Sequence, residues 1–411
     1  MDSAIVVVFF LVYLGMVLGG LPFLQLDRTG VALLGAIALI GMEALTPQQA
    51  ARSVHLPTLV LLFSFMVISA QLRLGGFYSW VTARLAGLPL SPAGLLGGVV
   101  LAAGGLSAVF SNDVVCLSMA PVLAGACLRR GLDPVPYLLG LACAANVGSA
   151  ATLIGNPQNM LIGSTLGLSF RAYAAEAAAP VALSLLVTWA IIARGARGRW
   201  RASAAGPAPT ERRADEPPAF DRWQSAKGLA VTAVLMAVFL LSDWPRDVAA
   251  LSGAGLLLTS RRLHSNKMLG LVDWELLVLF TGLFVVNHAL WRTGLTGAVV
   301  NDLATAGVHL ERPAPLFVAT LLLSNLVSNV PAVMLLLPLA GHAMAGPLLA
   351  LVSTLAGNLL IVGSIANMIV VDAAARQGVP IDWRSHARVG VPVTLASLAI
   401  VAAYLWLRLS V

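Results

Sequence analysis

The sequence predicts an all-α integral membrane protein made of two inverted repeats, and three observations support this fold class. Hydrophobic residues make up 59% of the 411 residues and charged residues only 10%, whereas about 25% of an average soluble domain is charged. Apolar runs of membrane-spanning length recur along the whole chain, and its two halves share ordered polar motifs. The composition excludes a soluble enzyme, a secreted disulfide scaffold and a nucleic-acid-binding protein, so the net charge of +7 is expected to lie in loops.

Eight unbroken apolar runs are candidate membrane-spanning helices, since about 20 apolar residues cross a bilayer. The first follows a start without basic residues, so we expect a retained helix and not a cleaved signal. Four further apolar stretches, at 93–128, 134–168, 313–345 and 347–375, are interrupted by polar residues, Gly or Pro. The unbroken runs lie at 3–20, 30–45, 57–74, 174–193, 227–243, 247–260, 274–291 and 389–408, and the run at 247–260 is the shortest.

Matching segments divide the chain into two repeats. The segment at 54–76 aligns without gaps to 272–294, but Leu and Val could pair there by chance. FSNDVVCLSMAP at 110–121 then matches VSNVPAVMLLLP at 327–338, and GNPQNML at 155–161 matches GSIANMI at 363–369. Because these polar matches keep their order and spacing, we expect a first transmembrane repeat at 1–193, a basic linker at 194–226 and a second, inverted transmembrane repeat at 227–411.

The topology follows if two of the broken stretches are re-entrant hairpins. Their arms would be 93–110 with 114–129, and 313–328 with 331–345. Each half then has five crossings plus one hairpin, and an odd number of crossings inverts the second half. This arrangement places 19 Lys and Arg residues on one side and 6 on the other. Basic loops stay in the cytoplasm, so the linker is predicted to be cytoplasmic and both termini periplasmic, in the inner membrane.

Four polar interruptions mark the predicted binding site. An unpaired backbone group in hydrocarbon costs several kcal/mol, so non-helical backbone persists only where protein or a water-filled cavity satisfies it. Paired interruptions in two halves of a transporter indicate its binding site near unwound helices at the bilayer midplane. The interruptions are Ser111 to Asp113, Asn146 to Asn159, Ser328 to Pro331, and Asn358 to Asn367.

Asp113 is the one carboxylate that lies far from any predicted membrane surface. An ionised carboxylate at that depth is costly, so it should form an ion pair, bind a cation or hold a proton. The alternative is a structural hydrogen bond that fixes the hairpin tip. We expect Asp113 to carry the coupling proton.

At these motifs the sequence resembles the ion transporter superfamily, in the branch of the arsenical pump permeases and NhaD-type sodium/proton antiporters. The motifs are FSNDVVCLSMAPV at 110–122, ANVGSAATLIGNPQNMLIG at 145–163, SNLVSNVPAVMLLLP at 324–338 and LAGNLLIVGSIANMIV at 355–370. The resemblance implies that solute and coupling ion bind between the two hairpin tips and two unwound helices. With Asn146 and Asn358, which lie in the interruptions themselves, the implied binding residues are Ser111, Asn112, Asp113, Gly155, Asn156, Gln158, Asn159, Ser328, Asn329, Gly363, Ser364 and Asn367.

The sequence also departs from patterns of this superfamily. Its dicarboxylate/sodium symporters carry Ser-Asn-Thr at both tips, whereas this chain has Ser-Asn-Asp and Ser-Asn-Val. A fixed negative charge at Asp113 opposes a carboxylate ligand. A common Gly-Ser-Pro-Ala-Asn pattern in the second half has Ile365 in place of Pro, so the second interruption lacks the proline that would favour it.

The predicted function is proton-coupled efflux of a small inorganic solute of the arsenite or antimonite type, by a secondary active transporter that is not an enzyme. A sodium/proton antiporter, a dicarboxylate or other organic-anion symporter, and a passive channel remain alternatives. The chain has no GxxxxGK[ST] motif, so we expect no ATP hydrolysis in it. We expect no cofactor and no metal, with coupling to a proton gradient or alternatively to sodium. Expected partners are the solute and membrane lipid but not nucleic acid; a homodimer and a separate soluble ATPase subunit stay open.

Overall fold

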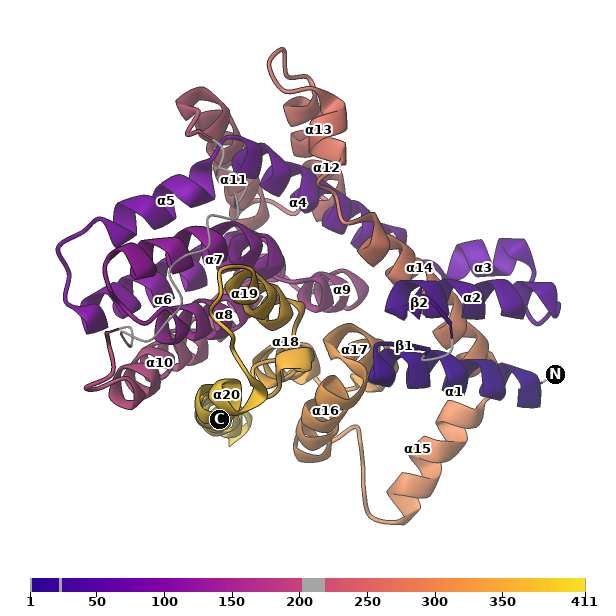
Figure 1. Cartoon of the computed structure of the whole chain (residues 1–411). Helices are drawn as coiled ribbons and strands as arrows, with labels where there is room; N and C mark the ends of the chain where they lie inside the picture. The colour runs from indigo at the N-terminus through magenta and orange to yellow at the C-terminus, as the bar shows by residue number, and fades with distance from the viewer. Residues whose placement is uncertain (1, 22–23, 202–218, 411) are drawn as a thin grey trace.

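The computed structural model describes residues 2–21, 24–201 and 219–410, and these residues are mostly helical (Figure 1). One short antiparallel pair, β1 (Gly20–Leu21) and β2 (Leu26–Asp27), joins the first two helices, with Gly20 opposite Asp27. The helices of the first half are α1 (Asp2–Leu18), α2 (Arg28–Gly41), α3 (Pro47–Ser53), α4 (Leu56–Leu74), α5 (Phe77–Ala86), α6 (Pro92–Val109), α7 (Asn112–Arg129), α8 (Val135–Ser149), α9 (Pro157–Thr165) and α10 (Phe170–Gly195).

The second half repeats this order of long, short and interrupted helices. It contains α11 (Arg222–Leu241), α12 (Arg246–Leu258), α13 (Ser265–Leu269), α14 (Trp274–Arg292), α15 (Leu295–Thr305), α16 (Pro313–Val327), α17 (Asn329–Leu336), α18 (Ala345–Ala356), α19 (Ile365–Arg376) and α20 (Trp383–Ser410), with 3-10 turns η1 (Leu337–Leu339) and η2 (Ile361–Gly363).

Seven helices of the described residues are long and apolar enough to cross a membrane: α4, α6, α7, α10, α11, α14 and α20. Shorter apolar helices, among them α1, α2, α8, α16 and α18, accompany them. The all-α membrane fold that the composition predicts is therefore confirmed.

Several predicted boundaries were wrong in detail. The second arm of the second hairpin, predicted at 331–345, ends as an α-helix at Leu336, because Pro338 cannot donate a hydrogen bond and its ring clashes with the carbonyl of residue 334. The short run at 247–260 forms the 13-residue α12, which at 1.5 Å per residue is only about 20 Å long. Helices α10 and α11 extend into the predicted linker at both ends, and residues 202–218 of that linker lie outside the described residues.

Helices from the two halves pack in reciprocal pairs. Helix α2 packs on α14, and α12 packs on α4, so that each half contributes its second helix to the fourth helix of the other half. Figure 1 shows α1–α3 beside α14 and α15 at one corner of the molecule, and α11–α13 beside α4 at another.

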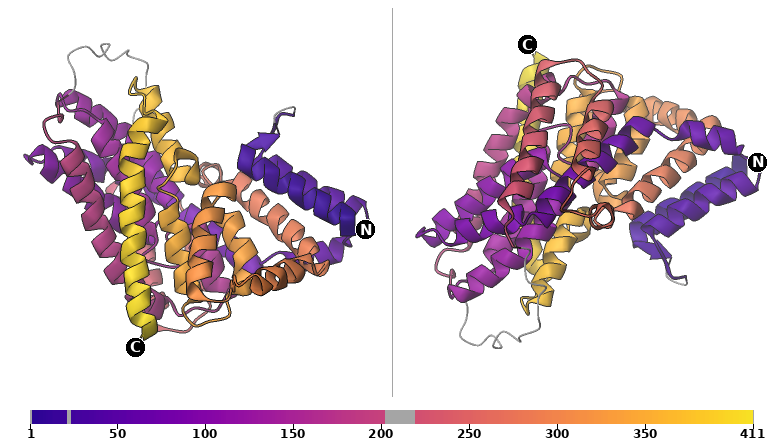
Figure 2. Two further views of the ribbon diagram at one scale, coloured as in Figure 1. Left: turned by 90° about the horizontal axis from the view of Figure 1, so that it is seen from below. Right: turned by 90° about the horizontal axis from the view of Figure 1, so that it is seen from above.

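The hairpins and the interrupted helices lie in the centre, between these two corners. Hairpin helix α6 packs on α8, and α16 packs on α18. The long helices α10 and α20 pack on each other, and α20 runs the length of the central bundle (Figure 2). Helices α7 and α8 of the first half also pack on α19 of the second, so the polar interruptions of both halves meet inside one bundle.

Candidate functional site

The tip of the first hairpin is attached to the interruption between α8 and α9. Only Phe110 and Ser111 separate α6 from α7, so Asn112 and Asp113 are already the first residues of a helix. The backbone N–H of Asn112 donates to the carbonyl of Gly155 at 3.2 Å. Its side-chain amide donates to Asn146 Oδ1 at 3.0 Å. The tip therefore has a defined position relative to the first broken helix.

Asn146 joins the two halves at the centre of the bundle. Its Nδ2 donates to Asn358 Oδ1 at 2.8 Å and to Asn367 Oδ1 at 3.1 Å. Its Oδ1 accepts from the Ser364 hydroxyl at 2.8 Å as well as from Asn112. Asn146 is only 2% exposed. One buried amide thus uses its donors and its acceptor to bridge residues more than 200 positions apart in the sequence, and four of the predicted site residues converge on it.

Thr354 on α18 forms hydrogen bonds with a second group of predicted residues. Its hydroxyl accepts from Asn156 Nδ2 at 3.1 Å and from Gln158 Nε2 at 3.3 Å, and it donates to Asn159 Oδ1 at 3.3 Å. Asn159 also donates to the carbonyl of Thr152 at 3.0 Å. The first interruption is therefore tied to the second half by two separate polar contacts, Asn146 and Thr354.

The two helical interruptions are shorter than predicted, and capping residues define them. Asn146 still belongs to α8, and the non-helical segment runs from Ala150 to Asn156, whose side chain caps α9 by accepting from the Asn159 N–H at 2.9 Å. Ser364 caps α19 in the same way, accepting from the Ala366 N–H at 3.2 Å. At Gly155 a Cβ would collide with the main chain of Ser149 and Ser107, so a residue without a side chain is required there.

The absence of Pro at position 365 does not prevent the second interruption. Ile365 is the first residue of α19, as Pro157 is the first residue of α9. Proline is favoured but not required at that position, since its N–H would have no intrahelical partner in any case. The interruption spans Gly357 to Ser364, where Asn367 Nδ2 donates to the carbonyls of Gly357 and Leu360. Side-chain donors thus satisfy the free carbonyls.

Asp113 lies in the first turn of α7 and is partly buried. A negative side chain is favourable near a helix N-terminus. Within the described residues, Asp113 makes no hydrogen bond and no ion pair, in contrast to its neighbour Asn112. The structural alternative from the sequence, a hydrogen bond of Asp113 that fixes the tip, is therefore not observed; Asn112 fixes it instead.

The second hairpin tip is less well connected. Ser328 joins α16 to α17 with φ +78°, a left-handed conformation that is unusual outside glycine. Ser328 and Asn329 form no side-chain hydrogen bond among the described residues, although the Asn329 amide lies beside Gly357 near Gly363. In the part of the chain that the structure describes, the side-chain oxygens of Asn112, Asn325 and Asn329 are buried without a partner. These three oxygens are free to accept a hydrogen bond or to bind a cation.

Two site residues were missed by sequence reasoning, Thr354 and His386. Thr354 lies one helical turn before Asn358, so its place among apolar residues could have indicated it. His386 is 2% exposed, and its Nε2 lies 3.1 Å from the main-chain oxygen of Asn358. The predicted span began at residue 389, whereas α20 begins at Trp383 because Asp382 accepts from the Ser385 N–H at 2.8 Å. Hydrogen bonds from the side chain and the backbone of Ser385 hold the pKa of the Asp382 carboxyl below its usual value.

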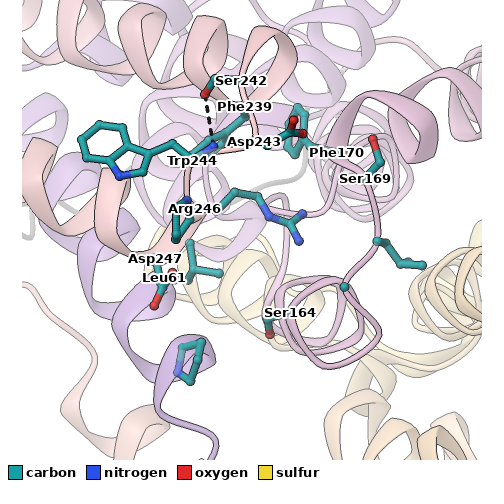
Figure 3. Close-up of a pocket in the computed structure, with 14 residues that line it drawn as sticks. Leu61, Ser164, Ser169, Phe170, Phe239, Ser242, Asp243, Trp244, Arg246 and Asp247 are labelled. Atoms are coloured by element: carbon teal, nitrogen blue, oxygen red, sulfur yellow. Dashed lines mark hydrogen bonds between the residues drawn. The ribbon is translucent and has the colours of Figure 1, made fainter.

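The two groups of side chains around Asn146 and Thr354 are polar and neutral. The residues that converge on Asn146 and Thr354 are amides and hydroxyls, and neither group includes Arg or Lys. A separate pocket of about 450 Å³ lies where the α9–α10 loop meets the α11–α12 turn, and it is lined by Ser164, Asp243, Arg246 and Asp247 among others (Figure 3). The predicted site residues do not line this pocket.

Known proteins resemble the chain over nearly its full length. The chain is 30% identical to the 46 kDa membrane protein of Mycobacterium leprae, over 93% of this chain and 94% of that protein. It is 30% identical to the silicon efflux transporter LSI3 of Oryza sativa subsp. japonica, over 92% of each. Among solved structures, the YdaH transporter of Alcanivorax borkumensis matches with a TM-score of 0.56 and 16% identity, over 100% of this chain and 98% of that one. That likeness concerns the fold.

The matching family is described as Citrate transporter (CitMHS), and it covers residues 9–356. This range includes the first hairpin tip, the first interruption and Thr354. A family match over most of the chain, together with full-length relatives that are transporters, shows that this multi-pass membrane protein belongs to the citrate transporter family.

Proposed function

We propose that this transporter exports a small, uncharged, hydroxylated inorganic acid, of the arsenous acid type, in exchange for protons. The observation that carries the proposal is the neutral lining of the site. Citrate is a multiply charged anion at neutral pH, and proteins bind carboxylates with Arg or other charged donors. The amides and hydroxyls around Asn146 and Thr354 instead match a neutral solute that both donates and accepts hydrogen bonds.

A relative supports the same solute class. The rice protein that is 30% identical to this chain is named a silicon efflux transporter. Dissolved silicon is largely silicic acid at neutral pH, which like arsenous acid is a small neutral molecule with several hydroxyl groups. The likeness to arsenical pump permeases seen in the hairpin motifs is consistent with that chemistry.

Asp113 supports proton coupling. A partly buried carboxylate without an ion pair is costly in a membrane when ionised, so it is suited to bind a proton in one state of the cycle and release it in another. Alternating access of one central site by two inverted repeats would couple the two movements. The reciprocal packing of α2 on α14 and of α12 on α4 supports this arrangement.

Sodium is the second candidate for the coupling ion. The buried, unpartnered side-chain oxygens of Asn112, Asn325 and Asn329 favour it, since carbonyl oxygens at interrupted helices coordinate sodium in transporters. Sodium coupling requires a sodium gradient and proton coupling requires a proton gradient, so transport under each gradient separates the two.

The test is transport in proteoliposomes that contain the purified protein. Arsenite, silicic acid and citrate are each supplied under an imposed proton gradient, a sodium gradient or neither. We expect arsenite or silicic acid to accumulate against its gradient when a proton gradient is imposed, and citrate not to accumulate. Accumulation of citrate alone would contradict the proposal, and equilibration without accumulation would indicate a channel.

A further inference from the structure

Arg246 connects a corner of the molecule to the central bundle. It is the first residue of α12, and its Nη2 donates to the carbonyl of Gly163 in the last turn of α9 at 2.9 Å. Figure 3 shows its side chain reaching across the pocket from the turn that carries Trp244 towards the helix turn that carries Ser164. The N-terminal end of the same helix α9 carries Asn156 and Gln158 of the site. Arg246 therefore positions a site helix from its opposite end.

Arg28 occupies the matching position in the other half. It is the first residue of α2, as Arg246 is the first residue of α12, and the two are separated by 218 residues, as are the segments at 54–76 and 272–294. Arg28 is partly buried, and its Nε is enclosed without a hydrogen-bond partner. Within the described residues, no hydrogen bond of Arg28 corresponds to the bond between Arg246 and Gly163.

The carbonyl that corresponds to the acceptor of Arg246 lies at the end of α19. Helix α9 ends where the Leu168 N–H donates to Gly163 O at 3.0 Å, after Gly167 with φ +60°. Helix α19 ends in a similar motif: the Val379 N–H donates to Ala374 O at 3.0 Å, after Gly378 with φ +76°, and Ala374 O also accepts from the Gln377 N–H at 3.0 Å. Both are left-handed glycine caps of one kind. By this correspondence, Ala374 O is the counterpart of the Gly163 carbonyl that Arg246 binds.

Helices α9 and α19 also differ in the helices on which they pack. Helix α9 packs on α4, next to the helix that carries Arg246, whereas α19 packs mainly on α7 and α8. Of the two corresponding arginine contacts, the structure forms the one between Arg246 and Gly163, and among the described residues Arg28 does not bind Ala374 O. Two repeats of one fold are expected to differ in this way when the structure holds one of two alternate states.

We propose that Arg246 and Arg28 bind the ends of the two broken helices alternately: Arg246 holds Gly163 in the state described here, and Arg28 holds Ala374 in the state that opens to the opposite side of the membrane. The proposal rests on the alternating access of the proposed function. Each arginine stabilises one state through a charge-assisted hydrogen bond, so loss of either one shifts the ratio of the two states, in opposite directions.

The test measures access to the site from each side of the membrane. A Val330→Cys reporter at the second hairpin tip is placed in a background with Cys116, Cys127 and Cys143 changed to Ala, and transport by this protein is verified. A membrane-impermeant maleimide is added to right-side-out and to inside-out vesicles, and the two labelling rates are compared. Arg246→Ala should change their ratio roughly tenfold, and Arg28→Ala roughly tenfold the other way, since a hydrogen bond to a charged group contributes about 1.5–3 kcal/mol.

The double variant Arg28→Ala/Arg246→Ala should return the ratio close to that of the parent protein. Arg52→Ala and Arg84→Ala are the matched controls, since both are exposed arginines in the last turns of α3 and α5. Arg28→Met and Arg246→Met, which keep most of the side-chain length but have no hydrogen-bond donor, replace the Ala variants if those do not fold.

The possible failures can be told apart. If the parent protein is labelled from both sides but both arginine variants shift the ratio in one direction, or neither shifts it, the alternating contacts are disproved while alternating access stands. If the reporter in the parent protein is never reachable from more than one side under any gradient, alternating access itself is disproved, and the inference with it.

Discussion

Asp113 is the residue on which the proposed proton coupling depends. It lies at the first hairpin tip without a hydrogen bond or ion pair among the described residues, while Asn112 holds the tip in place. A change at Asp113 can therefore alter proton binding without loosening the hairpin.

Asp113→Asn should retain solute exchange but lose pH-driven accumulation. Asparagine has nearly the size of aspartate and can hydrogen-bond, but it cannot take up and release a proton. The measurement compares exchange at equal pH with accumulation under an imposed pH gradient, in the same proteoliposomes. Accumulation at the level of the unmodified protein would exclude Asp113 as the proton carrier.

Asn112 and Asn329, which the sequence treats as equivalent, should differ when each is changed to Ala. Both variants should impair transport if the two tips share one site. Only Asn112→Ala should also lower stability, by about 1 kcal/mol, because its amide donates to Asn146 whereas the Asn329 side chain forms no hydrogen bond among the described residues. Thermal unfolding in detergent gives the stability, and vesicle transport gives the activity. Normal transport by Asn329→Ala would remove that residue from the site.

His386 should act through the Asn358 carbonyl that it contacts. In His386→Leu a buried carbonyl loses its partner, and the apparent KM for solute should rise because Asn358 also accepts from Asn146. His386→Gln retains an N–H donor and should restore KM. His288→Leu, on α14 and outside the two polar groups around Asn146 and Thr354, is the control. Equal KM values for His386→Leu and His386→Gln would show that the hydrogen bond does not position the site.

The elements show how local sequence specifies the interruptions. Asn156 and Ser364 each cap a helix by accepting from a backbone N–H of its first turn, although their following residues are Pro157 and Ile365. The cap, and the polar side chains that satisfy the freed carbonyls, define where each helix restarts. A proline at the first helical position is not required for that boundary.

Ile365→Pro should be tolerated and should leave stability unchanged or raise it by about 0.4–1 kcal/mol. Position 365 is the first residue of α19, and Ser364 before it has φ −145° and ψ 139°, the extended conformation that a following proline prefers. Thermal unfolding of the purified variant provides the check, with Ala366→Pro as a disruptive control because the Ala366 N–H donates to Ser364. A marked loss of stability for Ile365→Pro would mean that α19 begins elsewhere.

At the scale of the whole molecule, each half packs its second helix on the fourth helix of the other half. The packing of α7 and α8 on α19 brings both interruptions into one bundle. Orientation in the membrane is a separate property, which the distribution of basic residues predicts through the 19-to-6 difference between the two sides.

A reporter enzyme that is active only in the periplasm should be silent when it is fused at position 205, within the linker. The same reporter fused at the C-terminus should be active, because both termini are predicted to be periplasmic. Colony assays with a cytoplasmic reporter at the same two positions serve as the reciprocal control. A strong periplasmic signal at position 205 would reverse the proposed topology.

The sequence predicted the bounds of the first two hairpin arms closely, and it located both interruptions but made them too long. The arms expected at 93–110 and 114–129 are α6 at Pro92–Val109 and α7 at Asn112–Arg129, since Pro92 and the polar tip bound the apolar runs on both sides. The end of α17 at Leu336 and the start of α20 at Trp383 were missed. Those boundaries depend on a single proline and on a capping carboxylate beyond the apolar run, which hydropathy does not detect.

The sequence by itself determined that the chain is a helical membrane protein, where its helices are interrupted, and which polar residues lie at those interruptions. These properties follow from hydropathy and from the local preferences of Asn, Ser, Gly and Pro. Only the tertiary structure decided that Asn146 and Thr354 join the two halves and that His386 contacts the site. It also decided that the side chain of Asn112 is bonded at the first tip, whereas those of Ser328 and Asn329 form no hydrogen bond with the described residues. Which donor meets which acceptor across some 200 residues depends on how α8, α18 and α19 pack, and no local pattern encodes that packing.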